Sequence, residues 1–161
     1  MHHKTPYGAN AYRAIGIETG VAAADPLGLV VMLYDGAIHA IVRAETHLDK
    51  GEIEARGTYA LKAIDIINQG LVASLDKRIG GTLAEGLASL YEYMARRLFA
   101  ANLQADRAIF EEVRGLLSEL REAWITLREE QASGKALAFE RMRPGNRSAD
   151  SIVASGWSAT A

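Results

Sequence analysis

The chain has 161 residues, the size of a single domain. It is 49% apolar and 24% charged with a formal net charge of -2, so it lacks the basic excess that a nucleic-acid-binding module needs. It contains no cysteine, which excludes a disulfide framework, a thiolate metal site and a cysteine nucleophile.

The distribution of helix breakers predicts an all-α protein. The prolines are Pro6, Pro26 and Pro144, so the long stretch between the last two contains none. That stretch is rich in Ala, Leu, Glu and Arg, which favour helix. No apolar run approaches the roughly 18 residues that a membrane span needs, so we expect a cytoplasmic protein without such a span.

Residues 1–24 are predicted to form an N-terminal arm of irregular structure with apolar anchor points. Asp25 and Pro26 then begin a helix, because Asp is a good N-cap and Pro fits the first helical position. Apolar residues from Leu27 to Leu48 recur at three- and four-residue spacing, which predicts one amphipathic helix that ends near Lys50-Gly51.

Three more amphipathic helices are predicted after it. The second runs from about Glu52 to Leu75 and stops before the pair Gly80-Gly81. The third begins at a capping box, Thr82 to Glu85, and ends at a short reversal from Asn102 to Asp106. The fourth has Asp106 as its N-cap and is predicted to end at Ser133-Gly134.

The short connections and the spacing predict how these helices pack. Helices of about 24 residues joined by short turns run antiparallel to their neighbours, and the mixed spacing suits a crossing angle near 20°. We therefore expect an antiparallel up-down four-helix bundle over residues 25–131. Residues 132–161 are small and polar and are predicted to form a flexible, disordered tail, with a short helix over residues 136–142 as the alternative.

No group of residues predicts a catalytic, cofactor or metal site. The di-iron pattern of helical bundles needs Glu-x-x-His on two helices, and this pattern does not occur. His39 and His47 lie eight residues apart on one helix and cannot share an ion. The glycine pair is not followed by the Lys-Ser/Thr of a phosphate loop. We therefore expect neither an enzyme nor a bound cofactor.

The predicted helices carry more apolar side chains than one core stripe consumes. Two interpretations stay open, namely a generously packed core, or grooves that accept an amphipathic or extended partner segment. The surplus residues are Leu29, Val30, Leu33, Val42, Leu61, Ile66, Val72, Tyr91, Tyr93, Phe99, Leu103, Phe110, Leu116 and Ile125.

Glycines inside the predicted helices favour the second interpretation. Each costs about 1 kcal/mol relative to alanine, so close helix approach or a docked partner backbone should offset them. They are Gly28, Gly36, Gly57, Gly70, Gly86 and Gly115.

Two strings of residues resemble the flagellin-specific export chaperone family (FliS). The first is Met32-Leu33-Tyr34-Asp35-Gly36-Ala37, and the second is Arg96-Arg97-Leu98 followed by Ala101-Asn102. Further matches in the same order extend the resemblance over about residues 7–128. The chain departs from the family at Gly86, where Asn is frequent, and at His39, where a basic residue is common.

The resemblance implies a cytoplasmic helical bundle with no catalytic activity. Its partner would be the disordered C-terminal segment of flagellin, kept from premature polymerisation and presented to the flagellar export apparatus. The export gate and other flagellar regulators are further implied partners. The alternative function is a self-associating structural or adaptor bundle, for example a homodimer with exchanged arms.

The resemblance also implies roles for individual residues. The arm would act through Tyr7, Tyr12, Ile15 and Ile17, covering a groove that flagellin later takes. The implied groove walls, some of which can equally be core, are Tyr34, Leu71, Leu90, Tyr91, Met94, Leu98, Leu103 and Phe110. Arg97, Asn102 and Asp106 would contact the partner's backbone or fix the turn between the third and fourth helices.

Overall fold

The computed structural model describes residues 25–75 and 81–143, whose regular structure is entirely helical. Three of its elements follow one another without a break and form a single rod, so the described residues form four helical rods in all. The predicted all-α fold is confirmed. The arm lies outside the described residues, as do residues 144–161 of the predicted tail. The elements are α3 (Pro26–Asp49), α4 (Ile53–Asp65), the π-helical η1 (Ile66–Leu71), α5 (Val72–Leu75), α6 (Gly81–Gln104) and α7 (Arg107–Met142).

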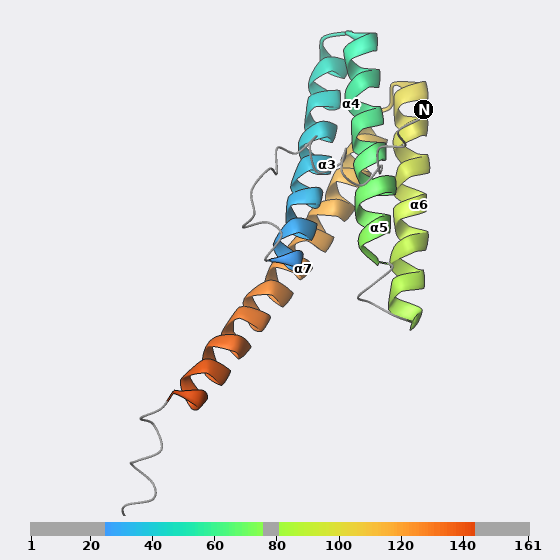
Figure 1. The fold of residues 1–161 in the computed structure, drawn as a ribbon. Helices are drawn as coiled ribbons and strands as arrows, with labels where there is room; N and C mark the ends of the chain where they lie inside the picture. The colour runs from blue at the N-terminus through green and yellow to red at the C-terminus, as the bar shows by residue number, and fades with distance from the viewer. Residues whose placement is uncertain (1–24, 76–80, 144–161) are drawn as a thin grey trace, which may run out of the picture. The chain divides into compact units, whose positions relative to one another are not determined.

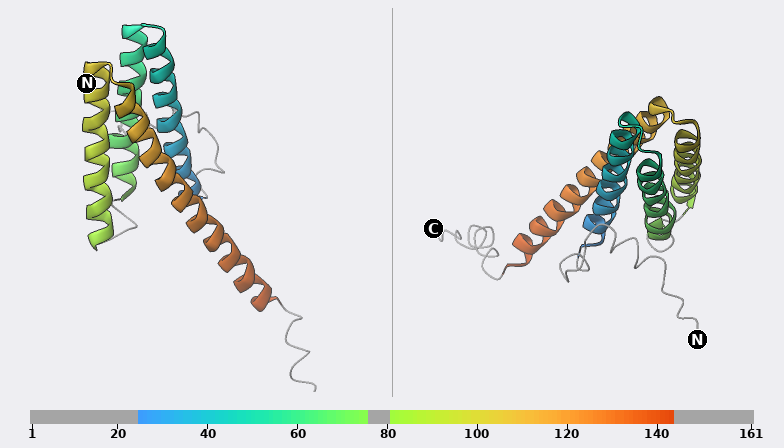
Figure 2. Two further views of the ribbon diagram at one scale, coloured as in Figure 1. Left: turned by 180° about the vertical axis from the view of Figure 1, so that it is seen from behind. Right: turned by 90° about the horizontal axis from the view of Figure 1, so that it is seen from above.

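The chain divides into two compact units, residues 1–125 and residues 126–161. In the first unit α4 packs against both α3 and α6, and Figure 1 shows α3, the rod from α4 to α5, and α6 side by side with alternating directions. The view from behind in Figure 2 shows the first part of α7 running next to these rods. The predicted antiparallel bundle is therefore confirmed.

Two helix starts follow from local capping. The side chain of Asp25 accepts a hydrogen bond from the amide of Gly28 at 3.0 Å, with Pro26 in the first turn. The side chain of Asp106 accepts from the amide of Ala108 at 3.0 Å, after a turn in which Ala105 has φ 51°. Both predicted N-caps are confirmed.

Two other predicted boundaries were wrong. Helix α6 begins at Gly81, so Thr82 lies inside its first turn rather than before it. Helix α7 continues through Ser133-Gly134 to Met142, because a serine and one glycine lower helix propensity without preventing helix when helix-forming residues follow. The alternative of a helix over residues 136–142 is thus the one observed, as the end of α7.

The centre of the core holds a hydrogen-bonded network from three helices. The hydroxyl oxygens of Tyr34 and Tyr91 lie 2.5 Å apart, and Trp124 Nε1 donates to the Tyr34 oxygen at 3.0 Å. Both tyrosines are fully buried, and burial raises the pKa of each, so both phenols stay neutral. The network ties α3 to α6 and to the first part of α7.

Three arginines of α7, spaced seven residues apart, pair with carboxylates of α3. Arg107 pairs with Asp49, Arg121 pairs with Asp35, and Arg114 Nε lies 3.1 Å from the carboxylate of Glu45. Spacing of seven keeps the three guanidinium groups on one face of a helix. The order of the partners confirms that α3 and α7 are antiparallel.

Among the described helices, α3 alone is long and apolar enough to cross a membrane. We expected no such helix, because no uninterrupted apolar run in the sequence is long enough. Half of the apolar stretch of α3 is buried inside the bundle. Its charged residues Asp35 and Glu45 pair with α7. A core helix passes the same test of composition, so we assign α3 to the core.

The network predicts unequal costs for removing its two hydroxyl groups. Tyr34→Phe removes the acceptor of the buried Trp124 N–H and also breaks the contact between the two hydroxyl groups, whereas Tyr91→Phe breaks only the contact between the hydroxyl groups. We expect Tyr34→Phe to lower the free energy of unfolding by about 2–3 kcal/mol and Tyr91→Phe by about 1 kcal/mol. Urea titrations followed by circular dichroism measure both, and a larger loss for Tyr91→Phe would contradict the network.

Gly70, in η1, predicts a second stability difference. A Cβ there would lie 2.7 Å from Leu33 Cδ2, and because Leu33 is fully buried it can shift only by displacing other core side chains. Overpacking of about 1–3 kcal/mol should exceed the helix-propensity gain of about 1 kcal/mol, so Gly70→Ala lowers stability. Gly115→Ala, with open space around it, is the matched control and should raise stability in the same titration.

Candidate partner-binding surface

Most of the predicted groove walls lie in the core. Six of them are less than 2% exposed and pack against one another, so they do not line an open groove. This is the generously packed core that the sequence left open, and a role of these six in partner binding stays a prediction. They are Tyr34, Leu71, Tyr91, Met94, Leu98 and Phe110.

The other two predicted wall residues differ from these six. Leu90 is partly buried and packs against the core. Leu103, near the end of α6, is 75% exposed. Phe99, one turn earlier on the same helix, is 60% exposed, so the two side chains share one stripe of α6.

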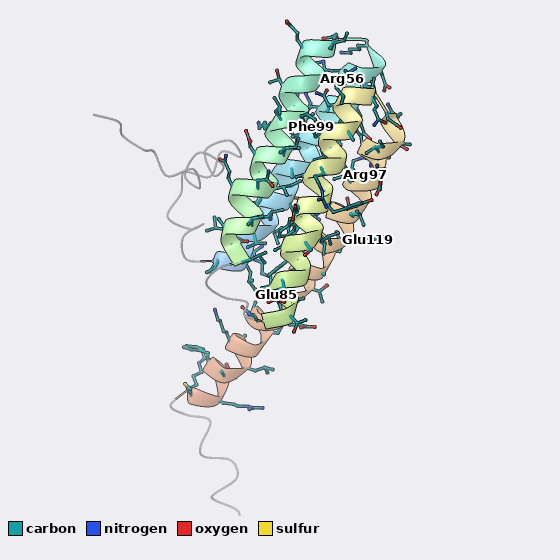
Figure 3. The ribbon with its side chains drawn as sticks, turned by 90° about the vertical axis from the view of Figure 1, so that its right-hand side faces the viewer. Arg56, Glu85, Arg97, Phe99 and Glu119 are labelled. Atoms are coloured by element: carbon teal, nitrogen blue, oxygen red, sulfur yellow. The ribbon has the colours of Figure 1, made fainter. Side chains whose placement is uncertain are left out.

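Helix α4 carries a matching exposed stripe beside α6. Ile53 is 67% exposed and Leu61 is 53% exposed, and Gly57 lies midway between them at the same four-residue spacing. Gly57 faces Asn102 of α6, which places the two stripes next to each other. We call Ile53, Leu61, Phe99 and Leu103 the α4–α6 patch, and Figure 3 labels Phe99 on this side of the bundle.

Sequence reasoning only partly found this patch. Leu61, Phe99 and Leu103 were among the surplus apolar residues, but only Leu103 was selected as a wall residue. Ile53 was expected in the core stripe of its helix, and it is exposed because it begins α4. Periodicity gives the apolar arc of a helix but not which flank a neighbouring helix covers.

The three predicted turn residues make contacts within the chain. Arg97, which Figure 3 labels, binds the carboxylate of Glu112 at 2.7 Å, and Tyr93 also donates to Glu112. The hydrogen bond from Tyr93 and then Arg97 lower the pKa of Glu112, and the hydrogen bond to Glu112 raises the pKa of Arg97. Asp106 caps α7. These contacts support the turn-fixing interpretation for Arg97 and Asp106.

Asn102 is held by a buried arginine of α4. Arg56 Nε donates to Asn102 Oδ1 at 3.0 Å, and Arg56 Nη2 donates to the Asn102 main-chain oxygen at 3.0 Å. The two residues are 46 positions apart, so sequence reasoning could not connect them. The contact fixes the end of α6 against the start of α4.

The histidines of the bundle do not form a metal site. His39 is exposed, as expected for a surface imidazole. His47 is more enclosed than expected, because its ring stacks on Tyr59 with centroids 5.3 Å apart and its Nδ1 lies 3.2 Å from Glu52. Among the described residues no three His, Asp or Glu side chains could hold a metal ion together.

The arm residues Tyr7, Tyr12, Ile15 and Ile17 lie outside the described residues, so their predicted roles stay predictions. Among the described residues, the α4–α6 patch is one exposed apolar surface, and Leu83 and the end of α7 carry other exposed apolar side chains. The α4–α6 patch spans two adjacent helices and has a polar amide at its centre.

Known proteins resemble the chain over most of its length. The family described as "Flagellar protein FliS" matches residues 8–131. A "Flagellar secretion chaperone FliS" of Salmonella typhimurium is 45% identical over 86% of this chain and 98% of its own length. Proteins of the same name from Escherichia coli and Bacillus subtilis are 41% and 33% identical over 73% and 77% of this chain, and each is covered over 86% of its own length.

The matched range includes the first three rods and ends inside α7, so residues 132–142 lengthen that helix beyond the part that the family describes. The name of these relatives describes a chaperone, which is not a class of enzyme. With an all-α bundle and matches over more than two thirds of its length, this chain belongs to the flagellar secretion chaperone family FliS.

Proposed function

We propose that this chain is a cytoplasmic export chaperone that binds the disordered C-terminal segment of flagellin on the α4–α6 patch. By covering that segment it prevents premature polymerisation and presents flagellin to the flagellar export apparatus. The export gate and other flagellar regulators are further partners in this proposal.

The observation that carries the proposal is the exposure of four large apolar side chains on two adjacent helices. Single exposed apolar residues are common, but a cluster of them marks a surface for another molecule. Two parallel apolar stripes suit an amphipathic segment that lies along the helices, with its apolar side chains inserted between them. A segment that is disordered when free can follow such a surface over several turns.

The predicted arm fits this proposal. Tyr7, Tyr12, Ile15 and Ile17 would cover apolar surface while no partner is bound, and flagellin would replace them. The proposed activity requires no catalytic step and no cofactor, since binding and release suffice.

The alternative is self-association through the same patch, because a second copy of the chain also offers apolar side chains. Sedimentation of the chain alone separates the two. A monomer at micromolar concentration that forms a one-to-one complex with flagellin supports the chaperone. A stable dimer that ignores flagellin supports the adaptor.

We expect Leu103→Ser to weaken binding of a C-terminal flagellin peptide about 10-fold or more, with unchanged thermal stability, because Leu103 is exposed and contributes little to the fold. Leu83→Ser is the matched control, since Leu83 is 63% exposed at the opposite end of α6. Calorimetric titration measures both, and a large negative heat-capacity change should accompany binding. Equal losses in the two variants, or no binding by the unaltered chain at micromolar concentration, would contradict the proposal.

A further inference from the structure

The side-chain amide of Asn102 is oriented by the protein. Its Oδ1 and the main-chain oxygen of the same residue both accept hydrogen bonds from Arg56, at 3.0 Å each. Arg56 is largely buried, and Figure 3 labels it near the start of α4. Because Arg56 offers only donors, it fixes the oxygen of the amide toward itself, and the NH2 group faces the other way.

That NH2 group has unused donor capacity. Among the described residues, no hydrogen-bond acceptor is paired with Asn102 Nδ2. Asn102 is partly exposed, so solvent or another molecule reaches this nitrogen. The residue next to it, Leu103, belongs to the α4–α6 patch, so the donor lies within an apolar surface.

Gly57 leaves the approach to this donor open. A Cβ added to Gly57 would lie 3.6 Å from Asn102 Nδ2, which is an ordinary van der Waals contact. The fold therefore accepts alanine at Gly57, and alanine is the better helix former. Gly70 is different, because its Cβ would lie 2.7 Å from Leu33. Gly57 is thus not required by packing within the chain, and its missing side chain makes room for an incoming backbone.

We propose that Asn102 Nδ2 donates a hydrogen bond to a main-chain carbonyl oxygen of the bound segment, which crosses the patch over Gly57. This inference rests on the proposed function and adds the chemistry of recognition. Arg56 is a positioning residue, since it acts only by fixing the amide of Asn102.

The acceptor is a neutral carbonyl for two reasons. The donor is an uncharged amide, and Arg56, the cation that contacts Asn102, already has the Asn102 oxygens as partners. The apolar side chains around it disfavour a charged acceptor, which would lose its hydration there. A carbonyl in the middle of a helix is already paired, so the segment crosses Gly57 in an extended stretch or at the end of a helix.

This donor holds the backbone of the segment without reading its sequence. Each residue of a partner has a carbonyl, whereas the apolar stripes select where its large side chains lie. The stripes therefore set the register, and the oriented donor binds the carbonyl that this register places over Gly57.

The test uses the full chain and a C-terminal flagellin peptide. Asn102→Asp keeps an oxygen for Arg56 but replaces the donor with a second oxygen that repels a carbonyl. We expect unchanged or higher thermal stability and peptide affinity lowered about 10-fold or more. Gly57→Ala should raise the melting temperature by about 2–6 °C and also lower affinity, because its methyl group covers the amide.

Gly115→Ala is the matched control, since alanine there gains the same helix propensity on another helix with open space around it. It should raise stability and leave affinity unchanged. If the unaltered chain binds the peptide and the Asn102 and Gly57 variants bind equally well, this inference fails while the proposed function stands. If the unaltered chain does not bind the peptide, the proposed function itself fails.

Discussion

The hydroxyl group of Tyr34 is the point on which the bundle depends, because it links three helices in the middle of the core. Tyr34 belongs to α3, and its hydroxyl group contacts Tyr91 of α6 and Trp124 of α7. A buried polar group is stable only with its partners in place, so the three helices can pack in one arrangement. Tyr34 and Tyr91, two of the predicted groove walls, are buried in this network, and their role in partner binding stays a prediction.

Two polar contacts on opposite sides of the bundle follow from that arrangement. On one side three arginines of α7 pair with α3. On the other, Arg56 ties the start of α4 to Asn102 at the end of α6. In the first set, each charged side chain has a partner of opposite charge within the chain. Beside the second contact, apolar side chains and one amide donor stay uncovered, and it is this side, formed by α4 and α6, that we propose as the docking surface.

Local chemistry explains what the sequence could predict. The N-caps Asp25 and Asp106 act within three residues, so the starts of α3 and α7 were found. Long-range packing explains what it could not. Phe110 and Leu103 looked alike as surplus apolar residues, yet one is buried and the other exposed, because only the placement of neighbouring helices separates them. The π-helical turn at Ile66–Leu71 was not predicted either, and Leu33 of another helix lies against it at Gly70.

Glycines inside helices therefore need two different explanations. At Gly70 the cost in helix propensity is offset by close contact with Leu33, and the fold itself requires the small residue. At Gly57 a methyl group would fit, so stability alone would favour alanine. A residue that lowers stability without serving the fold is expected where a surface must stay accessible. Gly57 lies between Ile53 and Leu61 and beside an oriented donor, and this position is the reason why we propose that a partner's backbone crosses the helix there.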